Sequence, residues 1–211
     1  KKRKYRAIPK GLFGKTLKQK FRYCDTVTID PSISTGITYH TFRANSLYDP
    51  DVTGTGHYPF MWPEYQQFYN HYTVLSAKIK ATFQRSGVGA DDTQGNFYCG
   101  IFTSAGASPD QTDITTVLEQ RDNRYKVAPV TYNKAKVVTK TVSISKFLGQ
   151  KVLGEDDNAG TATTNPAEMV YFQIWTGSNN EGIRDPASIR VLIEVEYIAV
   201  LHEPKVIAGS G

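Results

Sequence analysis

Apolar and polar residues alternate with a period of two along most of this chain. The clearest runs are residues 23–29, 77–83 and 190–197. This period is that of a β-strand with one buried face and one polar face. Because such strands must bury their apolar faces against another layer, the pattern predicts an all-β chain folded as an antiparallel two-sheet sandwich.

Turn-rich segments divide the chain into about eight expected strands. These strands lie near residues 22–30, 36–46, 73–85, 95–104, 124–131, 134–145, 168–177 and 187–201. The longest segment between them, residues 149–166, is rich in Gly, Asp, Asn and Thr, and we expect it to form an exposed outer loop. Eight strands fit a single double-sheet jelly roll, and their number alone fits an immunoglobulin-like sandwich as well.

Two short helices are expected in the connections. The first begins at Pro63 and carries four aromatic residues at helical spacing: Tyr65, Phe68, Tyr69 and Tyr72. In the second, Asp113 caps a turn whose apolar residues are Ile114, Val117 and Leu118. Both helices are too short to be stable alone and are expected to lie across the sheets.

The positive charge of the chain is concentrated at its N-terminus. The net charge is +5, but the first 22 residues contain ten basic residues and no acidic one. We therefore divide the chain into a basic arm at 1–22, partly extended or disordered, a body at 23–205 and a C-terminal tail at 206–211. The sequence does not begin with Met and has no signal-peptide pattern, so we expect more of the basic tail upstream.

A basic tail of this kind typically binds a polyanion. The residues we expect to bind nucleic acid are Lys1, Lys2, Arg3, Lys4, Tyr5, Arg6, Lys10, Lys15, Lys18, Lys20 and Arg22. Interleaved Tyr5, Phe13 and Phe21 are candidates for stacking on unpaired bases. The alternative is a solvated tail that serves only as a nuclear import signal, and the two roles are compatible.

One stretch of sequence is distinctive. It reads Ala44-Asn45-Ser46, Asp49-Pro50-Asp51, Thr53-Gly54 and Gly56-His57, then Pro59, and it leads into Tyr69-x-x-Tyr72-x-Val74. Over residues 41–80 this resembles the capsid proteins of circular, Rep-encoding single-stranded DNA viruses, the circoviruses and their relatives. Many of these relatives have Gln where this chain has Tyr58, which leaves the genus open.

The resemblance implies a structural protein with an eight-stranded jelly roll behind a basic arm. Copies, 60 of them in a T=1 shell, would form a small icosahedral particle around a circular single-stranded DNA genome. The arm would also act as a nuclear localisation signal, which implies the virion and the host nucleus as locations. A host receptor or glycan is a further partner that such a shell would have.

The resemblance also assigns a role to the stretch after the second strand. In the family this loop lies near subunit contacts, so we expect a structural and assembly role for Asn45, Asp49, Pro50, Asp51, Gly54, Gly56 and His57. The residue types agree, since Pro, Gly and Asp set turns and side-chain oxygens satisfy backbone donors. Calcium binding by Asp49 and Asp51 is the alternative, although the rest of a calcium loop is absent.

A jelly roll makes one further prediction about pairing. Its last strand lies between the first and the third, which would place Glu194 and Glu196 beside Lys78 and Lys80. Such cross-strand pairs contribute about 0.2–1 kcal/mol each. Tyr48, Tyr58 and Trp62 are candidates either for subunit contacts or for closing the ends of the sandwich.

Catalysis, metals and membranes find no support in the sequence. His40, His57, His71 and His202 show no metal-ligand spacing, and Cys24 and Cys99 fit no metal or redox motif. No nucleotide-binding or hydrolase motif is present and no apolar run is long enough to span a bilayer. We therefore expect no enzyme, no cofactor, no metal site and no membrane insertion.

Two other functions stay open from the residues alone. The first is a coat protein of a small RNA or satellite virus, because arm and sandwich do not distinguish the nucleic acid. The second is a carbohydrate-binding jelly-roll lectin, which has little use for an acid-free basic arm.

Overall fold

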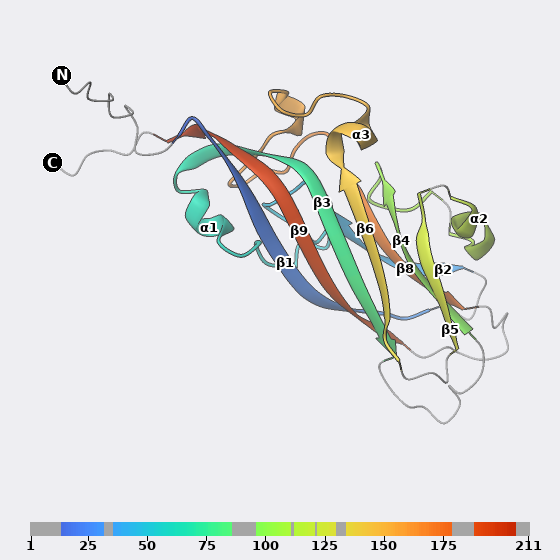
Figure 1. The fold of residues 1–211 in the computed structure, drawn as a ribbon. Coiled ribbons are helices and arrows are strands. Elements are labelled where there is room, and N and C mark those ends of the chain that lie inside the picture. Colours follow the sequence, from blue (N-terminus) through green and yellow to red (C-terminus); the bar gives the residue numbers. More distant parts are fainter. Residues whose placement is uncertain are drawn as a thin grey trace, which may run out of the picture.

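The chain folds into two antiparallel sheets that pack face to face (Figure 1). The computed structural model describes residues 14–31, 36–85, 96–110, 112–120, 122–129, 134–178 and 188–205. The first sheet contains β1 (Thr16–Ile29), β9 (Ile189–Pro204), β3 (Tyr69–Arg85) and β6 (Lys136–Ser143), with the short β7 (Gly160–Thr161) beside β3. The second contains β2 (Ile37–Arg43), β8 (Tyr171–Ser178), β4 (Asn96–Ser104) and β5 (Arg124–Pro129).

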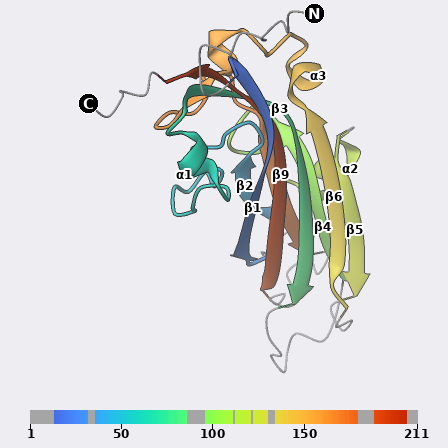
Figure 2. The same cartoon turned by 60° about the vertical axis from the view of Figure 1, so that its left-hand side comes forward.

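The order of the strands is that of a jelly roll. In the first sheet the order is β1-β9-β3-β6, and in the second it is β2-β8-β4-β5. Figure 2 shows the four long strands of the first sheet side by side in this order. The predicted fold class is therefore confirmed, including the last strand between the first and the third. The two-residue β7 was not predicted, and β1 begins six residues earlier than its apolar pattern suggested.

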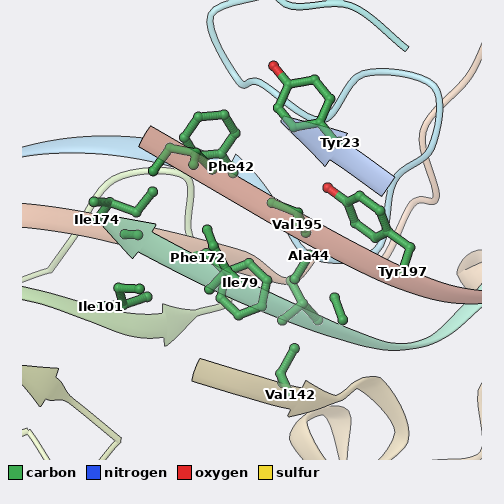
Figure 3. Packing of buried hydrophobic residues seen from close by; sticks show 14 of the residues in the cluster. Tyr23, Phe42, Ala44, Ile79, Ile101, Val142, Phe172, Ile174, Val195 and Tyr197 are labelled. Carbon is green, nitrogen blue, oxygen red and sulfur yellow. The ribbon is translucent and has the colours of Figure 1, made fainter. Parts of the chain in front are cut away.

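The core is built from the inward-facing residues of both sheets. Ile79 and Val195 of the first sheet are fully buried opposite Phe42, Phe172 and Ile174 of the second (Figure 3). Burial of each such side chain contributes about 1.5–3 kcal/mol relative to exposure. The period-two pattern in the sequence therefore predicts which side chains fill the space between the sheets.

The second sheet also has a covered outer face. The helix α2 (Ile114–Glu119) packs there through Val117 against Trp175 and Phe102. Asp113 caps this helix as predicted, because its Oδ1 accepts hydrogen bonds from the backbone N–H groups of Thr115 and Thr116. The outer face of the first sheet carries polar and charged side chains instead.

The prediction of a longer aromatic helix was wrong. Helix α1 covers only Trp62–Tyr65, and Tyr69 and Tyr72 belong to β3. The cause is tertiary pairing: Tyr69 lies opposite Pro204, and Tyr72 lies opposite Leu201, so β9 extends β3 towards its N-terminus. Both tyrosines are buried; the Tyr69 hydroxyl donates to the carbonyl of Gly14, and the Tyr72 ring packs edge to face against Trp62.

Two short helices were missed. Residues after β6 form α3 (Ile144–Leu148), and the expected outer loop contains the 3-10 helix η1 (Asp156–Asn158). This loop is not exposed throughout, since Val152 and Asn158 are buried. Among the described residues, no helix is long and apolar enough to span a bilayer.

Candidate nucleic-acid interface and assembly loop

The structure places the last part of the basic arm in β1. Residues 16–22, which the sequence assigned to the arm, pair with residues 196–202 of β9. Lys18, Lys20 and Arg22 alternate along this strand on the polar face of the first sheet, and all three are exposed. Lys15, also exposed, precedes the strand. Lys1, Lys2, Arg3, Lys4, Tyr5, Arg6 and Lys10 lie outside the described residues, as does Phe13.

The prediction that Phe21 stacks on unpaired bases is wrong. Phe21 is buried to 1% exposure, because the alternation that exposes Lys20 and Arg22 turns Phe21 inward. Its ring meets the rings of Trp62 and Tyr65 edge to face, with centroids 5.9 and 5.5 Å apart. Phe21 therefore belongs to the core and cannot stack on a nucleotide base.

The predicted charge pairing across β9 is confirmed in register. Glu194 lies opposite Lys80, and Glu196 lies opposite Lys78. The Lys80 ammonium donates to Glu194 Oε2 at 2.5 Å. Each of these side chains is more than 40% exposed, so the pair is screened by water and contributes little, on the order of 0–1 kcal/mol.

Glu196 has a different partner from the one expected. Its Oε2 lies 2.7 Å from the ammonium of Lys20 and 3.7 Å from Arg22 on β1. The hydrogen bond from Lys20 lowers the pKa of this carboxyl below its usual value. Because β9 lies between β1 and β3, its carboxylates can be reached from either side, and a long lysine need not bind the residue directly opposite.

In the assembly loop, Asn45 is a buried structural residue. It is 1% exposed, its Nδ2 donates to the carbonyl of Glu168 at 2.7 Å, and its Oδ1 accepts from the N–H of Val170 at 3.0 Å. These two bonds fasten the end of β2 to the segment that enters β8. The sequence indicated that Asn45 satisfies backbone groups, but its partners more than 120 residues away could not be identified from it.

The two aspartates of the loop are held by separate partners. Asp49 Oδ2 accepts from the Arg43 guanidinium at 2.7 Å. Asp51 is 2% exposed; its carboxylate oxygens lie 3.0 Å from His40 Nε2, and its Oδ1 also accepts from the N–H of Thr53. Both carboxylates are thus occupied by protein donors, and the described residues contain no cluster of three or more metal-ligating side chains.

Pro50 and the two glycines shape the backbone of the loop. The carbonyl of Pro50 accepts from the N–H of Arg43, which folds the loop back on β2. Gly54 has a φ of 72°, a left-handed conformation that favours glycine. Gly56 is required for space, because a Cβ there would lie 2.7 Å from the Tyr23 hydroxyl.

The end of this loop covers the open side of β1. The His57 ring packs against the Tyr23 ring at a tilt, with centroids 4.6 Å apart, and its Nε2 lies 3.0 Å from the carbonyl oxygen of Cys24. The N–H of Phe60 donates to the carbonyl of Arg22 at 2.8 Å. Residues 45–57 therefore connect β1, β2 and β8, which agrees with a structural role. Their place in subunit contacts remains a prediction.

The aromatic candidates for subunit contact fall into two groups. Trp62 is buried in the core against Tyr72, which excludes a subunit contact for it and agrees with the alternative expectation that it closes an end of the sandwich. Tyr48 and Tyr58 lie at the surface with ring centroids 6.1 Å apart, and subunit contacts through them remain a prediction. Phe60, which sequence reasoning missed, is 78% exposed.

A histidine pair was also missed. His71 and His202 lie opposite each other on β3 and β9, and their rings stack with centroids 5.6 Å apart. Burial, together with the neighbouring His71, lowers the pKa of His202. The strand register could have revealed this pair, but spacing along the chain could not. Cys24 and Cys99 are both free thiols, the first exposed and the second buried.

Comparison with known proteins gives similarities of fold only. No known protein family matches the sequence, and no curated protein does. Among solved structures, the chain is similar to the BFDV capsid protein in its 60-mer, with a TM-score of 0.48 and 9% identity over 94% of this chain and 100% of that chain.

Viral particles of other kinds give comparable values. A chain of Desmodium yellow mottle tymovirus has a TM-score of 0.45 and 12% identity over 98% of this chain and 99% of its own. A chain of the Macrobrachium rosenbergii nodavirus semi-empty particle, from the giant freshwater prawn, has a TM-score of 0.44 and 11% identity over 94% and 100%. All three scores are below 0.5, so the jelly-roll assignment rests on the sheet order of this chain itself.

Proposed function

We propose that this chain is a structural viral capsid protein that assembles into a closed icosahedral shell and packages nucleic acid through its basic N-terminal arm. The proposal rests on one observation: the basic segment at the N-terminus leads directly into the first strand of the jelly-roll body. A jelly-roll body begins with a strand whose exposed face bears Lys18, Lys20 and Arg22, and this strand continues directly from an acid-free basic segment. A polyanion bound by the arm would therefore lie against one defined side of the body.

The finer form of the proposal follows the resemblance of residues 41–80. The genome is circular single-stranded DNA, the shell has T=1 symmetry with 60 copies, and assembly takes place in the host nucleus. The arm then also carries the nuclear localisation signal. Catalysis has no part in this mechanism, which consists of self-association and neutralisation of phosphate charge. The C-terminal tail at 206–211 and the part of the basic arm that precedes β1 flank the assembling body.

Electron microscopy of the purified protein, with nuclease typing of its contents, tests this proposal. We expect closed particles that contain host-derived nucleic acid when the protein is expressed alone, and DNA when a circular single-stranded template is co-expressed. Particles that take up only RNA in the presence of that template would favour a coat protein of an RNA virus. Soluble monomers that bind a glycan array would favour a lectin and refute the proposal.

A variant with Lys1, Lys2, Arg3 and Lys4 replaced by Gln tests the arm separately. We expect this variant to form shells with less nucleic acid, measured by the ratio of absorbance at 260 and 280 nm. The matched control replaces four lysines of the body, Lys126, Lys134, Lys146 and Lys151, by Gln. Equal loss of nucleic acid from both variants would contradict a specific role of the arm.

A further inference from the structure

Six cations and two carboxylates share the outer face of the first sheet. On β1 these are Lys18, Lys20 and Arg22, on β3 they are Lys78 and Lys80, and β9 between them bears Arg190, Glu194 and Glu196. The register places Arg22 and Lys78 on either side of Glu196. The lysine and arginine rows therefore flank a central strand that carries Glu194 and Glu196 on this face.

Two of these lysines form no direct ion pair within the described residues, although Lys78 lies opposite Glu196 and its charge helps to lower the pKa of that carboxyl. Glu196 binds Lys20, and Glu194 binds Lys80. Lys18 and Lys78 are exposed, and neither forms an ion pair within the described part of the chain. The face thus keeps a net positive charge after its internal pairs are formed.

The shape and spacing of this face suit an extended polyanion. A hollow lies over β9, and its lining includes Arg22, Cys24, Lys78, Lys80, Glu194 and Glu196. Alternate residues of a strand are about 6.8 Å apart, which is similar to the separation of neighbouring phosphates along a nucleic-acid strand. Four threonine hydroxyls on this face can donate hydrogen bonds to phosphate oxygens, those of Thr26, Thr82, Thr139 and Thr141.

We propose that this sheet face is a second phosphate-binding surface, on which single-stranded nucleic acid held by the arm continues along the body. Glu194 and Glu196 compete with phosphate for the lysines, so they limit the affinity of the surface. The inference rests on the proposed capsid function for its partner. Charge complementarity and continuity with the basic segment favour nucleic acid, because the lysine row on β1 and the arm belong to one stretch of chain.

The salt dependence of binding by the full chain tests this proposal. The probe is a fluorescein-labelled 20-mer of thymidine, titrated by anisotropy at several NaCl concentrations. Each phosphate contact on a single strand contributes about 0.7 to the slope of log K against log salt. Replacing Lys18 and Lys78 by Gln should therefore reduce the slope by about 1.4 and weaken binding about tenfold at 0.15 M salt.

Three matched variants make the result specific. Replacing Lys126 and Lys151, exposed lysines elsewhere on the body, by Gln should leave the slope nearly unchanged. Replacing Glu194 and Glu196 by Gln should strengthen binding, and the control, with Glu119 and Glu155 replaced by Gln, should not. Equal effects of the sheet variants and their controls would overturn the proposal. A sulfated oligosaccharide serves as a second polyanion, and the proposal would also be overturned if replacing Lys18 and Lys78 weakened binding of this oligosaccharide but not of the oligonucleotide.

The labelling rate of Cys24 gives a second, positional measurement. This exposed thiol lines the hollow, whereas Cys99 is buried. We expect the oligonucleotide to slow alkylation of Cys24 severalfold in the wild-type chain, and unchanged alkylation at saturating oligonucleotide would overturn the proposal. The arm variant described above separates the two sites. If the slope of log K against log salt falls only in the arm variant, the sheet surface is refuted and the role of the arm stands. If the slope falls only in the Lys18 and Lys78 variant, the role of the arm is refuted and the sheet surface stands.

Discussion

A buried lysine offers a quantitative test of how the two sheets are joined. Lys140 lies on the inward face of β6, and its side chain is 5% exposed. Its ammonium donates to the carbonyl oxygen of Asp122 at 2.5 Å and lies 2.7 Å from the carboxylate Oδ1 of the same residue. Thr103 of β4 also donates to this carboxylate. Asp122 thus links β6 of the first sheet to β4 of the second.

Replacing Asp122 by Ala should destabilise the protein by about 2–3 kcal/mol, because it leaves a buried ammonium with one fewer charged acceptor. The value lies below that of a fully buried pair, since the Asp122 side chain is 61% exposed and water can reach it. Replacing Lys140 by Met should cost less than about 1 kcal/mol, because Met fills the space of the stem without burying a charge. With Met at 140, the Asp122 substitution should cost little.

Chemical denaturation of the four chains in this double-mutant cycle measures the coupling, which we expect to be about 2 kcal/mol. The pH dependence supplies a check. Burial alone would raise the pKa of Asp122, but hydrogen bonds from Lys140 and Thr103 hold it below its usual value. The contribution of Asp122 to the free energy of unfolding is therefore complete above the unfolded pKa of about 3.9, and it is lost as the pH falls through the lower pKa of the folded state. If Asp122→Ala costs the same with Lys or Met at position 140, the reasoning is refuted.

Two further predictions concern the assembly loop and the histidine pair. Gly56→Ala should destabilise the protein by about 1–3 kcal/mol, because the added methyl group crowds Tyr23. Gly54→Ala should cost about 1–2 kcal/mol from backbone strain, whereas Gly54→Asn should cost much less. Thermal unfolding compares the variants, and equal tolerance of Ala and Asn at position 54 would contradict the strain argument. Because the pKa of His202 is lowered, stability should fall as pH drops below about 6.5, the unfolded value. Denaturation curves between pH 7.5 and 5 should show this loss in the wild type and less of it in His202→Gln, and an identical profile in both would show that His202 is not its source.

The sequence predicts those parts of the fold that depend on local alternation. The inward residues of β3 and β9, such as Ile79 and Val195, follow the period-two pattern and are fully buried. The pattern fails for Tyr69 and Tyr72, whose spacing is helical although both lie in β3, because pairing with the end of β9 overrides local preference. Phe21 shows the converse: its basic neighbours suggested an arm, while the alternation that buries it is visible in the sequence.

The sequence predicts the kinds of role that the residues of the candidate site have, but not the partners that they bind. The turn-forming and backbone-satisfying roles of residues 45–57 follow from residue types, but the bonds of Asn45 to Glu168 and Val170 depend on the meeting of distant segments. Similarly, the jelly-roll order predicts which strands carry Lys78 and Glu196 side by side. It does not tell which of several long, flexible cations reaches that carboxylate, and Lys20 does.

The cover that the loop forms over β1 limits how copies of this chain can associate. β1 ends its sheet, and a strand in that position exposes backbone groups to which another chain can add. The bonds from Phe60 to Arg22 and from His57 to Cys24 occupy two successive outward carbonyls at the middle of the strand. A second subunit cannot extend the sheet there without displacing the loop. In the proposed shell, a contact at this point of the edge would therefore use side chains of the loop, such as the exposed ring of Phe60, and not a continuous intersubunit sheet.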